Sequence, residues 1–256
     1  MPIKRVTRGA AGRAVGVTVS NTVLIIDDDP TIIEMIQALL APRGYQILSA
    51  QDGEDGYWKA HTKNPGLIIC DLLLPRGHGF EVVQKVKARQ SLQSTPVILI
   101  TAVYKGPHNK IQGRLYGASA FLEKPLDPAT LLGLVQGLLP LPVQSSPRSE
   151  DQLEIELSRL RADYLSKLPA VVDWITRRCQ TLLNDQWDIE DARLLHQATH
   201  RMIGCGRNLK LDSVSNVAGR MECLLDNLLE QGSPPSDDDR ILLNSLLSDL
   251  CSAVIL

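Results

Sequence analysis

The stretch VLIIDDDP, residues 23–30, indicates how the first half of the chain folds. A run of four aliphatic residues is typical of a strand that is buried on both faces, and three aspartates follow it directly. Pro30 then opens a helical pattern in which isoleucines and leucines recur up to residue 40, and Asp29 is placed to cap that helix. The stretch therefore predicts a strand–helix unit with acidic side chains at the turn.

The same unit recurs along residues 21–139. Further apolar runs lie at 45–49, 67–70, 97–100 and 120–122, and further helical patterns lie at 53–63, 80–89, 110–117 and 128–138. Five apolar runs that alternate with five helices predict an α/β doubly wound fold, a five-stranded parallel sheet with helices on both faces. Such sheets bind ligands beyond the carboxyl ends of their strands.

Polar residues follow four of the five predicted strands at that edge. They are Asp27 and Asp28, Asp71, Thr101 and Lys124. Two carboxylates about 4 Å apart repel by about 4 kcal/mol at an effective dielectric of 20, so a divalent cation is expected among them. Oxygen ligands favour Mg²⁺, and a carboxylate beside Mg²⁺ can attack a phosphoryl group. Taken alone, the three aspartates after the first strand could instead be a helix-capping cluster.

Four segments together resemble the receiver domain of bacterial response regulators, a flavodoxin-like fold. They are VLIIDDDP, CDLLLPRGHGFE at 70–81, PVILITA at 96–102 and GASAFLEKP at 117–125. The resemblance implies that Asp71 is the phospho-acceptor and that Asp28 binds Mg²⁺ directly. It also implies that Asp27 holds metal-bound water and that the backbone carbonyl of Leu73 is a further ligand.

The same resemblance assigns the remaining residues of the predicted phosphorylation site. Thr101 and Phe121 match the family's hydroxyl and aromatic switch pair, although Phe121 on a strand could equally be a core residue. Lys124 matches the phosphate-contacting lysine, and Pro125 matches the proline that usually follows a cis bond. A receiver of this kind catalyses its own phosphorylation.

Strand patterns are absent from the second half of the sequence. Residues 140–150 contain three prolines and predict a linker, and residues 151–256 predict an all-α domain with a four-helix-bundle core. Its amphipathic helices are expected at 153–168, 169–183, 189–209, 211–229 and 237–254. Pro169 is suited to the first turn of the second of these.

The helix at 189–209 carries His196 and His200. His200 lies opposite the apolar stripe of this helix, so its ring is expected to face solvent, near Arg193, Arg207 and Gly204. An ordinary surface histidine has the same placement. Two histidines four residues apart could also bind a metal, but no third ligand is evident on that face.

The run LLHQATHRMIGCGRNLKL at 194–211, preceded by DYLSKLPAVVDWI at 163–175, resembles a histidine phosphotransfer (HPt) domain. The resemblance implies that His200 is phosphorylated and that Arg201 and Gly204 belong to its docking surface. Ile203 departs from the pattern, because the family usually has a lysine there. We hypothesise that Arg207 replaces that lysine.

Charge and cysteine content limit the other possibilities. Residues 1–20 carry four basic residues and no acidic one and predict a mobile basic tail, with a nucleic-acid or membrane contact as the alternative. Residues 150–256 have 11 Lys and Arg against 18 Asp and Glu, a net of −7, which argues against nucleic-acid binding. The five cysteines are an odd number and do not suggest a disulfide framework, which favours a cytoplasmic protein. No signal peptide and no apolar run of membrane-spanning length is evident, so we expect no membrane contact.

The sequence therefore predicts a phosphorelay protein of a two-component system. Its expected partners are a sensor histidine kinase and another receiver or HPt protein. No ATP site is visible, so we expect no kinase activity and no separate enzyme activity. The alternative is a receiver whose helical domain only docks or dimerises. The direction of phosphoryl flow, the oligomeric state and the meeting of Asp71 with His200 in one chain remain open.

Overall fold

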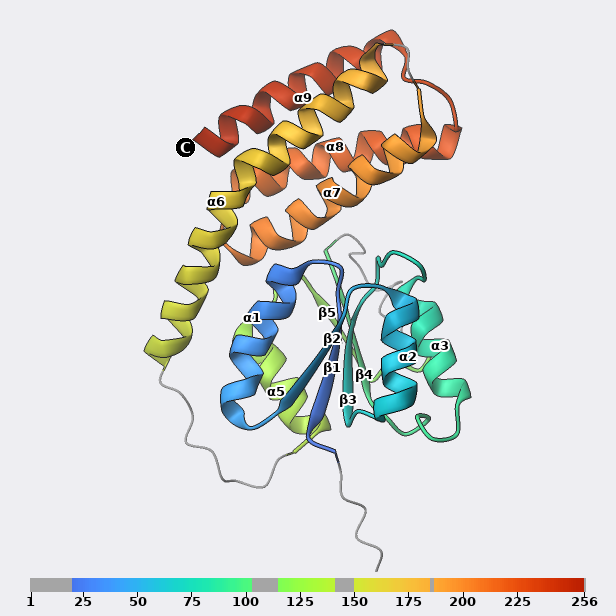
Figure 1. Ribbon diagram of the computed structural model, residues 1–256, viewed down its shortest axis with the longest axis vertical. Coiled ribbons are helices and arrows are strands. Elements are labelled where there is room, and N and C mark those ends of the chain that lie inside the picture. Colours follow the sequence, from blue (N-terminus) through green and yellow to red (C-terminus); the bar gives the residue numbers. More distant parts are fainter. Residues whose placement is uncertain (1–19, 103–114, 141–149, 185–186, 256) are drawn as a thin grey trace, which may run out of the picture.

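The computed structural model describes residues 20–102, 115–140, 150–184 and 187–255. The predicted tail at 1–20, helix at 110–117 and linker at 140–150 fall largely outside these residues. The described chain forms an α/β half, residues 20–140, and a helical half, residues 150–255 (Figure 1).

The α/β half is built on one parallel sheet of five strands in the order β2-β1-β3-β4-β5. The strands are β1 (Thr22–Ile26), β2 (Gln46–Ala50), β3 (Leu67–Asp71), β4 (Val97–Thr101) and β5 (Ala120–Glu123). Helices α1 (Pro30–Leu40) and α5 (Pro128–Leu138) cover one face, and α2 (Gly53–Lys63) and α3 (Gly79–Ala88) cover the other (Figure 1). The predicted flavodoxin-like five-stranded sheet is confirmed.

Side chains of the central strands alternate between two cores. Val23 and Ile25 of β1 pack with α1 and α5, whereas Leu24 and Ile26 pack with α2 and α3. All five residues of β3 and of β4 are buried for the same reason. An unbroken aliphatic run is therefore needed wherever helices cover both faces of a strand.

Helix α1 begins and ends as its sequence predicts. Asp29 accepts a hydrogen bond from the backbone N–H of Thr31 at 2.9 Å, and Pro30 occupies the first turn. After a short 3₁₀ turn, η1 (Ala41–Arg43), Gly44 adopts a positive φ of 92° that turns the chain toward β2. These caps fix the turn that carries Asp27 and Asp28.

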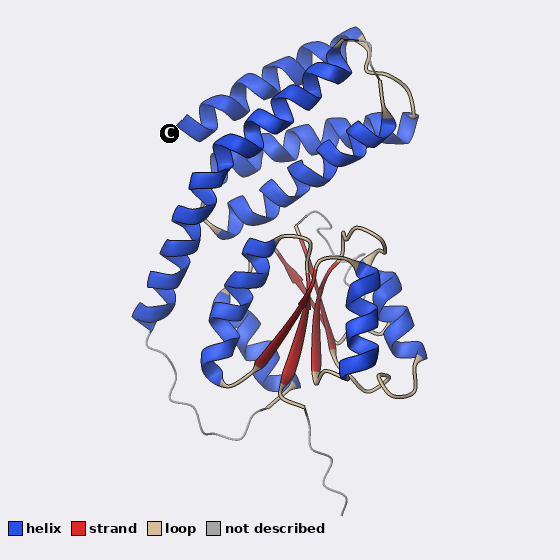
Figure 2. Ribbon diagram, viewed as in Figure 1, coloured by secondary structure: helices blue, strands red, loops and turns tan. Residues whose placement is uncertain are grey.

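The helical half consists of α6 (Glu150–Leu183), α7 (Ile189–Asn208), α8 (Asp212–Gln231) and α9 (Asp237–Ile255) (Figure 2). The four helices share a core that includes Leu182, Leu195, Leu225 and Leu246. None of the described helices is both long enough and apolar enough to cross a bilayer.

The prediction that Pro169 starts a new helix is wrong. Helix α6 runs through Pro169 without a break. A proline inside a helix costs about 3 kcal/mol because it lacks an N–H and crowds the preceding turn. Burial on both sides offsets this cost: Leu160 belongs to the core shared with α1, and Leu168 and Val172 belong to the core of the helical half. One helix thus ties the two halves together.

A substitution at Gly79, where α3 lies close to β3, tests the packing next to Asp71. A Cβ on Gly79 would lie 2.4 Å from the carbonyl oxygen of Asp71 and 2.8 Å from the Cα of Leu72, and these backbone atoms cannot yield. We expect Gly79→Ala to lower the free energy of unfolding by about 1–3 kcal/mol. Gly133→Ala in α5 is the matched control, because no atom lies within 4 Å of its added Cβ, and it should raise stability by up to about 1 kcal/mol. Urea unfolding of both variants measures the difference, and equal effects would contradict this account.

Candidate functional site

The polar residues predicted at the strand ends do lie together. Asp27 and Asp28 follow β1, Asp71 ends β3, Thr101 ends β4 and Lys124 follows β5. All five side chains are buried. One oxygen of each aspartate lies within 4.8 Å of one from each of the others, and we call Asp27, Asp28 and Asp71 the carboxylate cluster.

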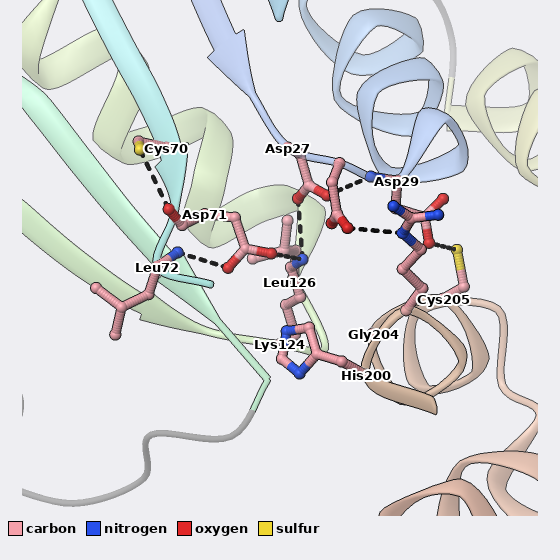
Figure 3. Close-up of polar contacts among 12 residues, drawn as sticks. Asp27, Asp29, Cys70, Asp71, Leu72, Lys124, Leu126, His200, Gly204 and Cys205 are labelled. Atoms are coloured by element: carbon pink, nitrogen blue, oxygen red, sulfur yellow. Dashed lines mark hydrogen bonds and ion pairs between the residues drawn. The ribbon is translucent and has the colours of Figure 1, made fainter. Parts of the chain in front are cut away.

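Lys124 lies between two members of this cluster. Its Nζ donates to Asp27 Oδ2 at 2.9 Å and to Asp71 Oδ2 at 2.7 Å (Figure 3). Burial by itself lowers the pKa of Lys124, but attraction to Asp27 and Asp71 outweighs burial and raises it. The lysine is therefore a permanent cation that draws the ends of β1 and β3 toward that of β5.

Desolvation acts on the aspartates in the opposite direction. Burial raises the pKa of Asp27 to about 7, against the attraction of Lys124. Burial also raises the pKa of Asp28, against the lowering by Arg201 of helix α7. The positive charge beside these two carboxylates therefore does not compensate for their burial.

Backbone amides hold two of the carboxylates in fixed orientations. Asp27 Oδ1 accepts from the N–H of Asp29 at 2.9 Å, and Asp71 Oδ1 accepts from the N–H of Leu72 at 2.6 Å. One oxygen of each aspartate in the cluster lies near one oxygen of each of the others. Three carboxylate oxygens that converge in this way form the donor set that Mg²⁺ prefers, so the cluster fits that ion.

The other residues predicted for this site occupy consistent positions. Thr101 is buried beside Lys124, whose N–H donates to the carbonyl of Thr101 at 2.7 Å. Phe121 is partly buried and packs against the core beneath α2 and α3. The Lys124–Pro125 bond is cis, as the resemblance implies. Leu73 lies in the loop after β3, and its role as a metal ligand stays a prediction.

The expectation that His200 faces solvent is wrong. Its exposed fraction is only 5%, because α7 lies against the α/β half at the carboxyl ends of the strands. We call this contact surface the junction. The helical pattern of α7 could not show that Glu222 of α8 and the α/β half cover this face of the helix.

The two ring nitrogens of His200 have different surroundings. Nδ1 donates to the buried carboxylate of Glu222 on α8 at 2.7 Å. Nε2 is buried and has no hydrogen-bond partner among the described residues. Burial alone lowers the pKa of His200, but the bond to Glu222 and the nearby charge of Asp71 raise it overall. Figure 3 shows the ring beside Lys124, at the edge of the carboxylate cluster.

Several hydrogen bonds cross the junction. Arg201 Nε donates to Asp28 Oδ2 at 2.6 Å, and the thiol of Cys205 donates to Asp29 Oδ2 at 2.6 Å. Two others join the backbone of the α/β half to α7: Arg207 donates to the carbonyl of Ala102 at 2.9 Å, and Asn208 Oδ1 accepts from the N–H of Leu126 at 2.6 Å.

Gly204 of α7 faces the side chain of Lys124. A Cβ at this position would lie 3.5 Å from Lys124 Cδ and 3.6 Å from its Nζ, which is ordinary contact distance. A methyl group fits there and a longer side chain does not. The contact predicted for Gly204 is therefore made with Lys124 of the same chain.

Sequence reasoning missed Glu222 and the junction residues Cys205 and Asn208. Glu222 could have been noticed as an acidic residue within the mostly apolar stripe of α8. His196, the histidine one turn before His200, bonds Asp226 Oδ1 at 2.7 Å instead and lies 3.9 Å from Glu222. Among the described residues, neither histidine belongs to a group with metal-binding geometry.

Comparison with known proteins gives the family. The model of the response regulator receiver domain matches residues 23–136. Protein PilH of Pseudomonas aeruginosa is 32% identical over 117 residues, which cover 46% of this chain and 96% of PilH. Among solved structures, chemotaxis protein CheY4 of Vibrio cholerae is 33% identical, with a TM-score of 0.44 over 46% of this chain and 98% of CheY4.

Two other relatives, both longer than PilH, are named as transcriptional regulators. The probable transcriptional regulator ycf29 of Pyropia yezoensis is 32% identical over 189 residues, which cover 70% of this chain and 84% of ycf29. The DNA-binding dual master transcriptional regulator RpaA of Synechocystis is 38% identical over 117 residues. That match covers 46% of this chain and only 48% of RpaA, so the chain spans about half the length of that relative. The chain belongs to the response regulator receiver family of two-component signalling proteins.

Proposed function

We propose that the chain is a phosphorelay protein in which Asp71 accepts a phosphoryl group and His200 exchanges it with an aspartate. In this proposal residues 21–139 are the receiver domain, and residues 151–256 are an HPt-like four-helix bundle. The proposed route of phosphoryl flow is from a sensor histidine kinase to Asp71, or between Asp71 and His200.

One observation carries the proposal. His200 Nε2 is buried beside the carboxylate cluster and lacks a hydrogen-bond partner among the described residues. An unsatisfied buried nitrogen costs about 1–3 kcal/mol. Because Glu222 accepts from Nδ1–H, the lone pair is left on Nε2, the atom that faces the α/β half. Glu222 is therefore a positioning residue, and Nε2 is the proposed nucleophile.

The transfer is an in-line displacement at phosphorus. When His200 is the donor, the Nε2–P bond breaks while a bond forms between phosphorus and a carboxylate oxygen of Asp71, and the electron pair returns to Nε2. In this proposal the ammonium of Lys124, which bonds Asp71, and the hydroxyl of the buried Thr101 stabilise the charge on the transferred group. Magnesium held by Asp27, Asp28, Asp71 and the carbonyl of Leu73 would neutralise further charge on the phosphoryl oxygens.

Access to Asp71 differs between the two exchange partners. With α7 at the junction, Asp71 is only 1% exposed, and the buried His200 lies close enough to feel its charge. A kinase, another receiver or another HPt protein can reach either residue only after α7 moves away. The proposed switch pair, Thr101 and Phe121, lies on the neighbouring strands β4 and β5. The proposal includes a cytoplasmic location and no contact with nucleic acid or membrane.

A second candidate function is a helical half that docks without transferring phosphate. Ile203, which stands where HPt domains usually have lysine, is buried in the core of the helical half and supplies no charge. Arg207, the proposed substitute, bonds the carbonyl next to Thr101. The junction itself would then be the functional contact, and phosphorylation of Asp71 would control it.

Chemical stability of the phosphoryl label separates these two functions. We expect the full chain, treated with radiolabelled acetyl phosphate and Mg²⁺, to carry both base-labile label on Asp71 and acid-labile label on His200. Asp71→Asn should lose both labels, because phosphate reaches His200 through Asp71. His200→Gln should keep only the base-labile label.

His196→Gln is the matched control for this experiment. His196 lies on the same helix but bonds Asp226, so its loss should leave both labels in place. Wild-type label that is wholly base-labile would contradict transfer and support the docking function. Acid-labile label that reappears when Asp71→Asn and His200→Gln are mixed would show exchange between chains.

Substitution of Gly204 tests whether transfer needs close docking. Gly204→Leu should abolish the acid-labile label, because its side chain would collide with Lys124, and it should preserve the base-labile label. Gly204→Ala should retain both labels, because its Cβ sits at ordinary contact distance. Circular dichroism should show that both variants fold. Normal labelling of Gly204→Leu on His200 would contradict transfer at the junction.

A further inference from the structure

Arg201 reaches from the helical half into the carboxylate cluster. Its Nε donates to Asp28 Oδ2 at 2.6 Å, which is the residue proposed to bind the metal directly. The junction bonds of Cys205, Arg207 and Asn208 involve Asp29 and backbone groups of Ala102 and Leu126. Arg201 is thus the junction donor that uses an oxygen of the cluster.

Charge balance explains why an arginine can occupy this position. Three carboxylates lie together, and Lys124 bonds two of them, Asp27 and Asp71. Asp28 takes its positive partner from Arg201 instead. The guanidinium therefore supplies part of the charge that a divalent cation would supply at the same oxygen.

The exposed fractions of the two side chains show which of them can leave the ion pair between Arg201 and Asp28. The side chain of Arg201 is 44% exposed, whereas that of Asp28 is 6% exposed. The guanidinium can rotate into water and remain solvated, but Asp28 stays buried and requires another cation. The contacts of Cys205, Arg207 and Asn208 do not depend on this rotation.

We propose that Arg201 and a divalent cation compete for Asp28, so that Mg²⁺ binding and docking of α7 at the junction oppose each other. The inference rests on the metal site of the proposed function. Because binding linkage is reciprocal, α7 lowers the affinity for Mg²⁺ by the same factor by which Mg²⁺ weakens docking. The cation thereby loosens the cover over Asp71, which admits an external phosphoryl donor.

Calorimetric titration of MgCl₂ into the metal-free full chain tests the competition without measuring activity. We expect Arg201→Gln to bind Mg²⁺ about fivefold more tightly than the wild type, the lower end of usual coupling between sites. Arg193→Gln is the matched control, because this exposed arginine of α7 pairs with Glu190 of the same helix, and its affinity should equal that of the wild type.

A second variant separates direct competition from general loosening. Asn208→Ala removes a junction contact that does not touch the cluster. It should tighten Mg²⁺ binding in the wild-type background, because undocking withdraws Arg201, and it should have no effect in Arg201→Gln. Hydrogen exchange of α7 should rise with Mg²⁺ in the wild type and much less in Arg201→Gln.

Each outcome has a separate meaning. Equal Mg²⁺ affinity of the wild type and Arg201→Gln would overturn the competition and leave the proposed phosphotransfer intact. An equal gain from Asn208→Ala in both backgrounds would also overturn it, because coupling would then bypass Arg201. Failure of all proteins to bind Mg²⁺ would contradict the metal site of the proposed function itself.

Discussion

The buried ammonium of Lys124 holds the candidate site together. It bonds carboxylates that follow β1 and β3, and its own backbone follows β5. Without it, three buried carboxylates would face each other, and loss of one partner from a buried ion pair costs about 3–5 kcal/mol. One lysine cannot balance three acids, so a cation or the basic groups of α7 must supply the rest. Because the charge balance is incomplete, Asp28 at this edge of the sheet can pair either with a metal or with a basic side chain of the helical half.

The helical half completes this site through the packing of two helices. Helix α6 contributes Leu160 to the core shared with α1 and Leu168 to the core of the helical half, so it fixes the position of α7 over the strand ends. Helix α8 contributes Glu222, which orients the ring of His200. The environment of the histidine therefore depends on the register between helices as much as on its own sequence motif.

Patterns that act over a few residues are sufficient to predict the α/β half. The aliphatic runs predict its strands, Asp29 predicts the start of α1, and the rule for parallel strand ends places Asp71 and Lys124 at one edge of the sheet. The errors arise where distant segments compete with local preference. Pro169 favours a helix start locally, but burial on both sides keeps α6 continuous. The burial of His200 depends on a surface more than sixty residues away in the sequence.

Two glycines allow α7 to pack against both α8 and the α/β half. A Cβ on Gly206 would lie 2.2 Å from Ser215 Oγ of α8, whereas a Cβ on Gly204 would meet Lys124 of the α/β half. Two residues apart on a helix, they face in different directions. Helix α7 can therefore approach α8 closely enough for Glu222 to bond His200, and the strand ends closely enough for His200 to lie beside Asp71. A bulky residue at either position would separate one of these pairs, so the spacing of two small residues defines the geometry of the candidate reaction.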